Sequence, residues 1–232
     1  MFNITNKKKT RLIFFIILLI TPFVFFQKNK LKHLIQTENT NQKSTYYTEK
    51  VSQFKLIGRS KSDVLFIGDS LIDNAEWHEL INANKVINRG IQGTTTENLI
   101  TLLPVINLSE APTVVLMIGI NDIKREYSVK IITENYERII DNLVSRHGSV
   151  FVTSLLLDSD NQIHLRKVIS LNTAINNIAK KYPTAKYIDL YKQLTINGKL
   201  SSEYSVDGTH LNGKGYQQWS LLLNNSIGNH QE

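Results

Sequence analysis

The feature that most constrains the fold is an alternation of short apolar runs with helical patterns from residue 63 onward. Five runs have the length and the β-branched, apolar composition of strands that are buried on both faces. They span residues 64–67, 85–88, 113–118, 149–154 and 186–190. Strands that alternate with helices predict right-handed crossovers and a parallel sheet.

The segments between these runs carry helical periods. Apolar residues recur every three or four positions within 129–143, 168–178 and 216–223. A similar period over 99–106 contains Pro104, which should end or kink that helix. We therefore expect an α/β fold, a flavodoxin-like three-layer sandwich with a five-stranded parallel sheet. Ligands bind at the carboxyl ends of the strands in such sheets.

The N-terminal part has a different character. Residues 12–26 form an apolar run, with lysine and arginine before it and lysine after it. The run is shorter than the roughly 20 residues of a membrane-spanning helix, but flanking lysines can snorkel to the interface. The alternative is a cleaved signal peptide, although no small-residue cleavage site follows Phe26. We expect a cytoplasmic tip and transmembrane anchor at 1–27, a polar stalk at 28–60 and a folded domain at 61–232.

The charge distribution bears on location and on partners. Residues 1–60 hold 11 Lys/Arg against 2 Asp/Glu, which leaves 16 against 18 for residues 61–232. The folded domain is therefore slightly acidic, and a nucleic-acid partner is excluded because such a binder carries its basic surface on the fold. The dense cluster at 7–11 favours an inside N-terminus, a single-pass protein of the cell membrane and an extracytoplasmic domain.

Polar residues and glycines follow the first three expected strands. Ser70 follows the first strand in Gly68-Asp69-Ser70, and Asn121 follows the third in Gly119-Ile120-Asn121-Asp122. The segment after the second strand offers Gly90 and Gly93 as places where the backbone could approach a ligand. Taken singly, each has an ordinary interpretation as a helix cap, an Asx turn or a loop glycine.

Asp207-Gly208-Thr209-His210 lies near the C-terminus. A carboxylate three residues before a histidine can orient its ring and stabilise the imidazolium that forms when a serine is deprotonated. A metal pair is the competing interpretation, but no third ligand accompanies it. The other histidines lie outside any such pattern, and we expect them at the surface. They are His33, His78, His147, His164 and His230.

Together, these blocks resemble the SGNH/GDSL hydrolase family over residues 62–227. The resemblance implies that Ser70 is the nucleophile, His210 its base and Asp207 the residue that orients the base. It also implies an oxyanion hole made by the N–H groups of Ser70 and Gly93 and the amide of Asn121. Asp69 and Asp122 are expected to brace turns, and Gly90 is the alternative to Gly93.

The implied activity is that of a serine ester hydrolase on short acyl, above all acetyl, esters of small molecules, glycans or lipids. We find no long apolar insertion that could form a lipid-binding lid. No metal or organic cofactor is required. One alternative is an O-acetyltransferase of cell-envelope glycans, served by a partner acyl-donor membrane protein. The other is an inactive binding domain, which would not need all five of the matched residues.

Overall fold

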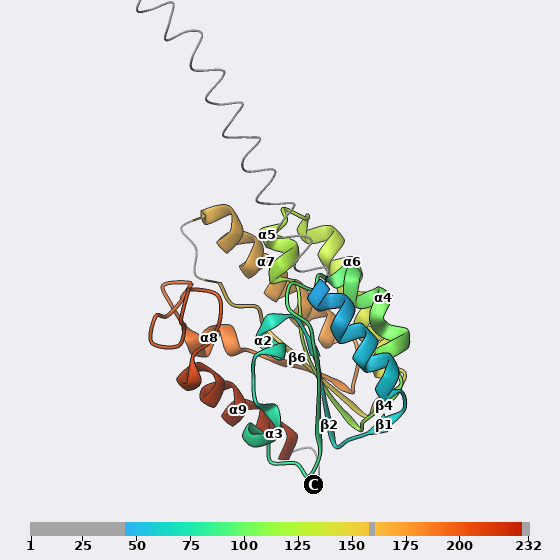
Figure 1. The fold of residues 1–232 in the computed structure, drawn as a ribbon. Helices are drawn as coiled ribbons and strands as arrows, with labels where there is room; N and C mark the ends of the chain where they lie inside the picture. Colours follow the sequence, from blue (N-terminus) through green and yellow to red (C-terminus); the bar gives the residue numbers. More distant parts are fainter. Residues whose placement is uncertain (1–44, 158–160, 229–232) are drawn as a thin grey trace, which may run out of the picture. The chain divides into compact units, whose positions relative to one another are not determined.

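The structure is a computed structural model that describes residues 45–157 and 161–228 (Figure 1). The expected anchor at 1–27 and the first part of the expected stalk lie outside these residues. Within the described ranges, no helix combines the length and the apolar character needed to cross a bilayer.

A five-stranded parallel sheet forms the centre of the domain, with the strand order β3-β2-β5-β6-β7. This is the strand order of flavodoxin-like folds, and each expected strand is present to within a few residues. The sheet comprises β2 (Val64–Gly68), β3 (Val86–Gly90), β5 (Thr113–Met117), β6 (Ser149–Thr153) and β7 (Ala185–Ile188). All residues of β2 and β5 are buried.

Helices cover both faces of the sheet, so the expected three layers are present (Figure 1). Three long helices pack side by side on one face: α4 (Thr96–Ile106), α6 (Val129–Val144) and α7 (Gln162–Ala179). The other face carries α2 (Ser70–Asp73), α3 (Trp77–Leu80) and α9 (Gly213–Gly228). The two remaining short helices are α5 (Ile120–Lys124) and α8 (Leu190–Leu194).

Pro104 lies inside α4, and the helix ends two residues later at Ile106. The last turn is closed by the N–H of Asn107, which donates to the carbonyl of Leu103. The expectation that Pro104 ends or kinks its helix agrees with this position in the last turn, where its missing N–H removes the intrahelical hydrogen bond to the carbonyl of Ile100.

An aromatic cluster fills the space between the sheet and α9. Trp77 stacks on Phe66 with ring centroids 4.1 Å apart, and Trp219 meets Trp77 edge-on at 4.8 Å. Both tryptophans are almost fully buried. Because aromatic side chains bury large areas, this cluster is what holds α3 and α9 against β2.

Two small sheets lie outside the central one. β1 (Ser60–Lys61) pairs in parallel with β4 (Ser109–Glu110), and β8 (Thr195–Ile196) pairs with β9 (Lys199–Leu200) as a hairpin. Pairs of two residues have no periodicity of their own, so the sequence did not predict them.

A further helix occupies residues 45–57, inside the segment expected to be stalk. The compact unit that contains the sheet begins at Tyr47, well before the expected boundary at residue 61. Phe54 is buried and carries the guanidinium of Arg89 over its ring at 4.6 Å. Lys50 forms an ion pair with Asp73 of α2 at 2.8 Å. The last part of the expected stalk therefore packs on the domain, because an apolar side chain and a cation find partners there.

Candidate active site

Ser70 is the first residue of α2, and only Asp69 separates it from the end of β2. Asp69 caps this helix, since its carboxylate accepts the N–H of Leu71 at 3.0 Å. Gly68 allows the tight packing that this turn requires: a Cβ there would lie 2.0 Å from the carbonyl oxygen of Met117. The serine is thus presented at the carboxyl edge of the sheet by a turn that tolerates little change.

Asp207 and His210 lie together on the loop that precedes α9. Oδ2 of Asp207 lies 2.7 Å from Nδ1 of His210. Oδ1 of Asp207 accepts the backbone N–H groups of His210 and Thr209, at 2.7 and 2.9 Å. Three hydrogen bonds from one short turn therefore fix the carboxylate relative to the ring.

The electrostatics of this turn favour the ionised carboxylate. Burial would raise the pKa of Asp207, but the hydrogen bonds from the His210 N–H, its ring and the Thr209 N–H outweigh that effect and lower the pKa to about 2. The carboxylate therefore remains charged and can accept the Nδ1–H of the ring. This leaves Nε2 as the free basic nitrogen of a neutral His210.

Nε2 of His210 lies 3.0 Å from Oγ of Ser70. The structure thus brings together all three residues of the expected triad in one chain of hydrogen bonds, from serine to imidazole to carboxylate. Such a chain can remove a proton from the serine hydroxyl as its oxygen forms a new bond.

The structure also distinguishes Gly93 from Gly90. The N–H of Gly90 donates to the side chain of Asn88 at 2.8 Å, and a Cβ at Gly90 would collide with the backbone of Asp73. Gly93 has a left-handed backbone with φ of 73°. Within the described part of the chain, no group accepts the N–H of Gly93 or of Ser70. The backbone N–H of Gly93 is therefore available to donate to a ligand, whereas that of Gly90 is not.

Asn121 lies at the start of α5, after β5, and its amide donates to the carbonyl of Thr94 at 3.0 Å. This bond links Asn121 to the residue that follows Gly93. The neighbouring Asp122 accepts the N–H and the hydroxyl of Thr96, the latter at 2.6 Å. Asp69 and Asp122 therefore brace turns, as expected.

Two basic residues at the end of α5, Lys124 and the following Arg125, contact the loops of the site, although they were not among the residues expected from the sequence. Nζ of Lys124 donates to Oγ1 of Thr209 at 2.9 Å, within the Asp207–His210 turn. The guanidinium of Arg125 donates to the carbonyl of Gly93 at 3.1 Å. Both contacts join loops far apart in sequence, and no local pattern could have revealed them.

One expectation about the histidines is wrong. His147 is 7% exposed and not a surface residue, because it packs under the start of β5 with its Nδ1 bonded to the carbonyl of Ala111 at 2.7 Å. His164 pairs with Glu126, and His78 lies between two glutamates. His33 and His230 lie outside the described residues. In the described ranges, no three His, Asp or Glu side chains gather in a way that could hold a metal ion.

Comparison with known proteins gives a family match. The model of the GDSL-like lipase/acylhydrolase family matches residues 66–218. The alpha2 subunit of platelet-activating factor acetylhydrolase IB from Rattus norvegicus is 25% identical over 165 residues, which cover 66% of this chain and 71% of that protein.

Solved structures agree in fold. A protein of Streptococcus pneumonia described as a platelet activating factor superposes with a TM-score of 0.74 and 26% identity, over 81% of this chain and 95% of the other. An acetylxylan esterase from Geobacillus stearothermophilus gives a TM-score of 0.60 at 16% identity, over 73% of this chain and 95% of the other. At that identity the second likeness concerns the fold alone.

Proposed function

The chain belongs to the GDSL-like lipase/acylhydrolase family and is thus a carboxylic ester hydrolase, and from this we propose that it removes short acyl groups, above all acetyl, through a covalent intermediate on Ser70. The observation that carries the proposal is the chain of hydrogen bonds from Ser70 to His210 to Asp207. An inactive binding domain would have no need of this arrangement.

The proposed mechanism has two steps. As Oγ of Ser70 attacks the ester carbonyl, Nε2 of His210 takes its proton, and Asp207 stabilises the imidazolium. The imidazolium then gives this proton to the departing alcohol, which leaves an acyl group on Ser70. Water attacks the acyl-enzyme with His210 again as base, and releases the acid and the free serine.

The negative charge on the carbonyl oxygen needs donors. We assign this role to the N–H groups of Ser70 and Gly93 and to the side-chain amide of Asn121. The segments that carry them follow three neighbouring strands, β2, β3 and β5. Asn121 uses one amide hydrogen for Thr94, which orients the group and leaves the other for the substrate. Preorganised donors of this kind stabilise the tetrahedral intermediate.

Two observations favour a short acyl group. The rat relative is, by its name, an acetylhydrolase, and the acetylxylan esterase shares the fold. In addition, the described segments around Ser70 are short turns and short helices and include no long apolar insertion that could cover an acyl chain. Acetyl esters of small molecules, glycans or lipids are therefore the substrates that we propose.

The apolar run at 12–26 adds a proposal about location. We infer that it anchors the chain in the cell membrane with the domain outside the cytoplasm, where acylated envelope glycans would be within reach. The same triad could pass the acyl group to a sugar hydroxyl in place of water. That second activity, an O-acetyltransfer, would need an acyl-donor membrane protein as its partner.

The experiment uses full-length protein in a mild non-ionic detergent with p-nitrophenyl acetate, butyrate and octanoate. We expect turnover that falls as the acyl chain lengthens, and a loss of at least about 10⁴-fold in Ser70→Ala. Ser202→Ala is the matched control, because Ser202 is an exposed serine of the loop before α9 that takes no part in the triad. It should keep full activity.

The outcomes separate the alternatives. Activity retained in Ser70→Ala would overturn the nucleophile assignment, and a preference for octanoate would replace acetyl by longer chains. Labelling of Ser70 by a fluorophosphonate without turnover of any ester would favour the transferase. The absence of both labelling and turnover would point to a binding domain.

A further inference from the structure

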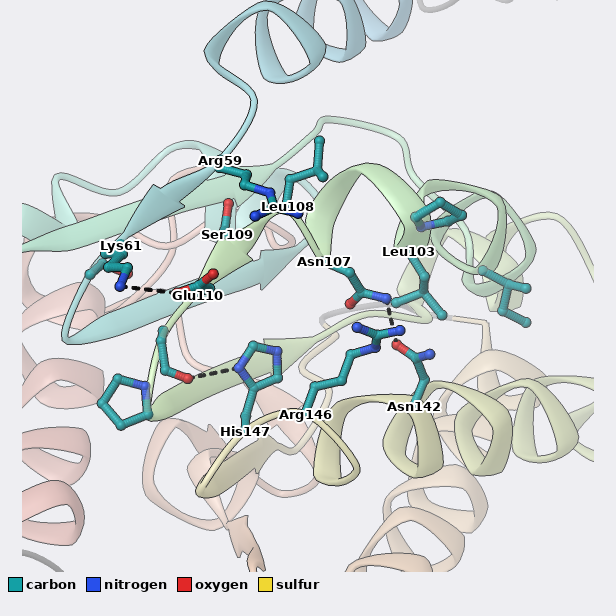
Figure 2. A pocket seen from close by; sticks show the side chains of 15 residues that line it. Arg59, Lys61, Leu103, Asn107, Leu108, Ser109, Glu110, Asn142, Arg146 and His147 are labelled. Atoms are coloured by element: carbon teal, nitrogen blue, oxygen red, sulfur yellow. Dashed lines mark hydrogen bonds and ion pairs between the residues drawn. The ribbon is translucent and has the colours of Figure 1, made fainter.

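A groove of about 1200 Å³ lies at the edge of the sheet opposite Ser70 (Figure 2). Its wall is formed by the paired strands β1 and β4, by the residues just before β5 and β6, and by the last turns of α4 and α6. The triad follows the carboxyl ends of the strands, whereas this groove lies at their amino ends. The mechanism proposed above uses none of its residues.

Three buried polar atoms of groove-lining residues have no hydrogen-bond partner among the described residues: Oγ of Ser62, Oδ1 of Asn107 and Nε2 of His147. Ser62 and His147 are each 7% exposed. Native proteins rarely leave buried polar atoms unpaired, so their gathering at one cavity is informative. It indicates a place where a ligand completes the hydrogen bonds.

The geometry fixes which atoms act as acceptors. Nδ1 of His147 donates to the carbonyl of Ala111, so Nε2 carries the lone pair while the ring is neutral. Burial and the charge of Arg146 lower the pKa of His147 and keep it neutral. The amide nitrogen of Asn107 donates to Asn142 at 3.1 Å, which leaves its oxygen free. Figure 2 shows the Nε2 edge of His147 turned away from Ala111 and toward the groove.

The groove also carries an excess of positive charge. Its wall contains Arg59, Lys61 and Arg146 against a single carboxylate, Glu110. Glu110 pairs with Lys61 at 3.5 Å, whereas the described part of the chain offers no ion-pair partner to either arginine. Arg146 follows the end of α6 and Arg59 follows the end of the helix at 45–57, where a cation complements the helix dipole. Neither arginine is therefore neutralised by a carboxylate of the described residues, and both are left to meet an anion.

We propose that this groove binds an anionic ligand that bears hydroxyl groups, of the sugar-acid or sugar-phosphate class. The two arginines meet the carboxylate or phosphate, and hydroxyl groups donate to Asn107 and His147. Leu103, Pro104 and Leu108 of the same wall offer apolar contact to a sugar ring. The volume exceeds what a single inorganic anion would fill, and it suits one or two sugar rings.

The test measures binding to the full-length protein by isothermal titration and ligand-observed NMR. The probes are glucuronate and glucose 6-phosphate, with glucose and inorganic phosphate as the neutral and the sugar-free comparisons. We expect saturable binding of both acidic sugars and at least about tenfold weaker binding of the two comparison compounds. The double variant Arg59→Gln/Arg146→Gln should weaken binding of the acidic sugars at least about tenfold.

Arg166→Gln is the matched control, because Arg166 is an exposed arginine of α7 that does not line the groove. It should bind like the wild type, and all variants should hydrolyse p-nitrophenyl acetate equally. No saturable binding of either acidic sugar, or binding that persists in the double variant, would overturn the proposal. Binding of inorganic phosphate as tight as that of glucose 6-phosphate would also overturn it. Because the readout is binding, its failure is distinct from failure of the proposed esterase activity.

Discussion

Nε2 of His210 lies 3.0 Å from Oγ of Ser70, although 140 positions separate the two residues in the chain. The contact joins the turn after β2 to the loop before α9. It therefore depends on the packing of α9 against the sheet, to which the aromatic cluster of Phe66, Trp77 and Trp219 contributes.

Replacing the carboxylate partner tests the triad without removing the nucleophile. We expect Asp207→Asn to lower kcat for p-nitrophenyl acetate about 10⁴-fold, because an amide at this position no longer fixes the ring with Nε2 free. Steady-state kinetics against Asp189→Asn, a cap of α8 away from the triad, provide the comparison. Equal losses in the two variants would contradict the assignment.

The oxyanion role of Asn121 makes a separate prediction. Asn121→Asp keeps the size of the side chain but removes the donor, so kcat should fall about 10²–10³-fold while KM changes little. Asn121→Ala should do the same. If kcat is retained in Asn121→Asp with an unchanged melting temperature, Asn121 is not a donor to the intermediate.

Lys124 positions the Asp207–His210 turn through Thr209. Removal of an exposed hydrogen bond of this kind should cost about 1 kcal/mol, so we expect Lys124→Met to lower kcat about two- to tenfold. Thr209→Val should show a similar loss. A double-mutant cycle with both substitutions checks the pairing, and fully additive losses would show that the two residues act independently.

Asp69 predicts a pH dependence of stability. Burial raises its pKa to about 7, and the charge of Asp122 adds to the shift. A carboxyl group whose pKa is raised on folding stabilises the fold at low pH, and this contribution is lost as the pH rises from about 4 to about 7. Asp69→Asn stays neutral and should be more stable than the wild type at pH 8, by at most about 4 kcal/mol.

The measurement is urea unfolding of both proteins at pH 8 and at pH 5. The advantage of Asp69→Asn should shrink at the lower pH, where the wild-type carboxyl is protonated. Asp63→Asn, at a partly exposed site, is the control and should show no such trend. An advantage that does not depend on pH would contradict a titration of Asp69.

Much of the fold follows from local sequence. The apolar runs at 64–67 and 113–118 are continuous because both faces of their strands are covered, and that continuity is visible without a structure. The triad residues could be predicted because each belongs to a recognisable sequence block. Their assembly, however, depends on contacts across the whole chain.

What the sequence missed has a common physical reason. His147 has no pattern around it, and its burial results from the packing of the end of α6 under β5. The helix at 45–57 appeared to be stalk because its composition is polar, and only the partners of Phe54 and Lys50 show that it packs. Long-range contacts of single side chains leave no periodic trace.

The contact between Lys50 and Asp73 bears on the effect of removing the proposed membrane anchor. Asp73 is the last residue of α2, the helix that begins with Ser70. The helix at 45–57 is therefore bound by an ion pair to the element that presents the nucleophile. Proteolytic release ahead of residue 45 would leave this ion pair intact and should yield an active fragment. A cut between residues 58 and 60 would separate Lys50 from the domain. The released fragment would then lack this ion pair, and its activity should be lower.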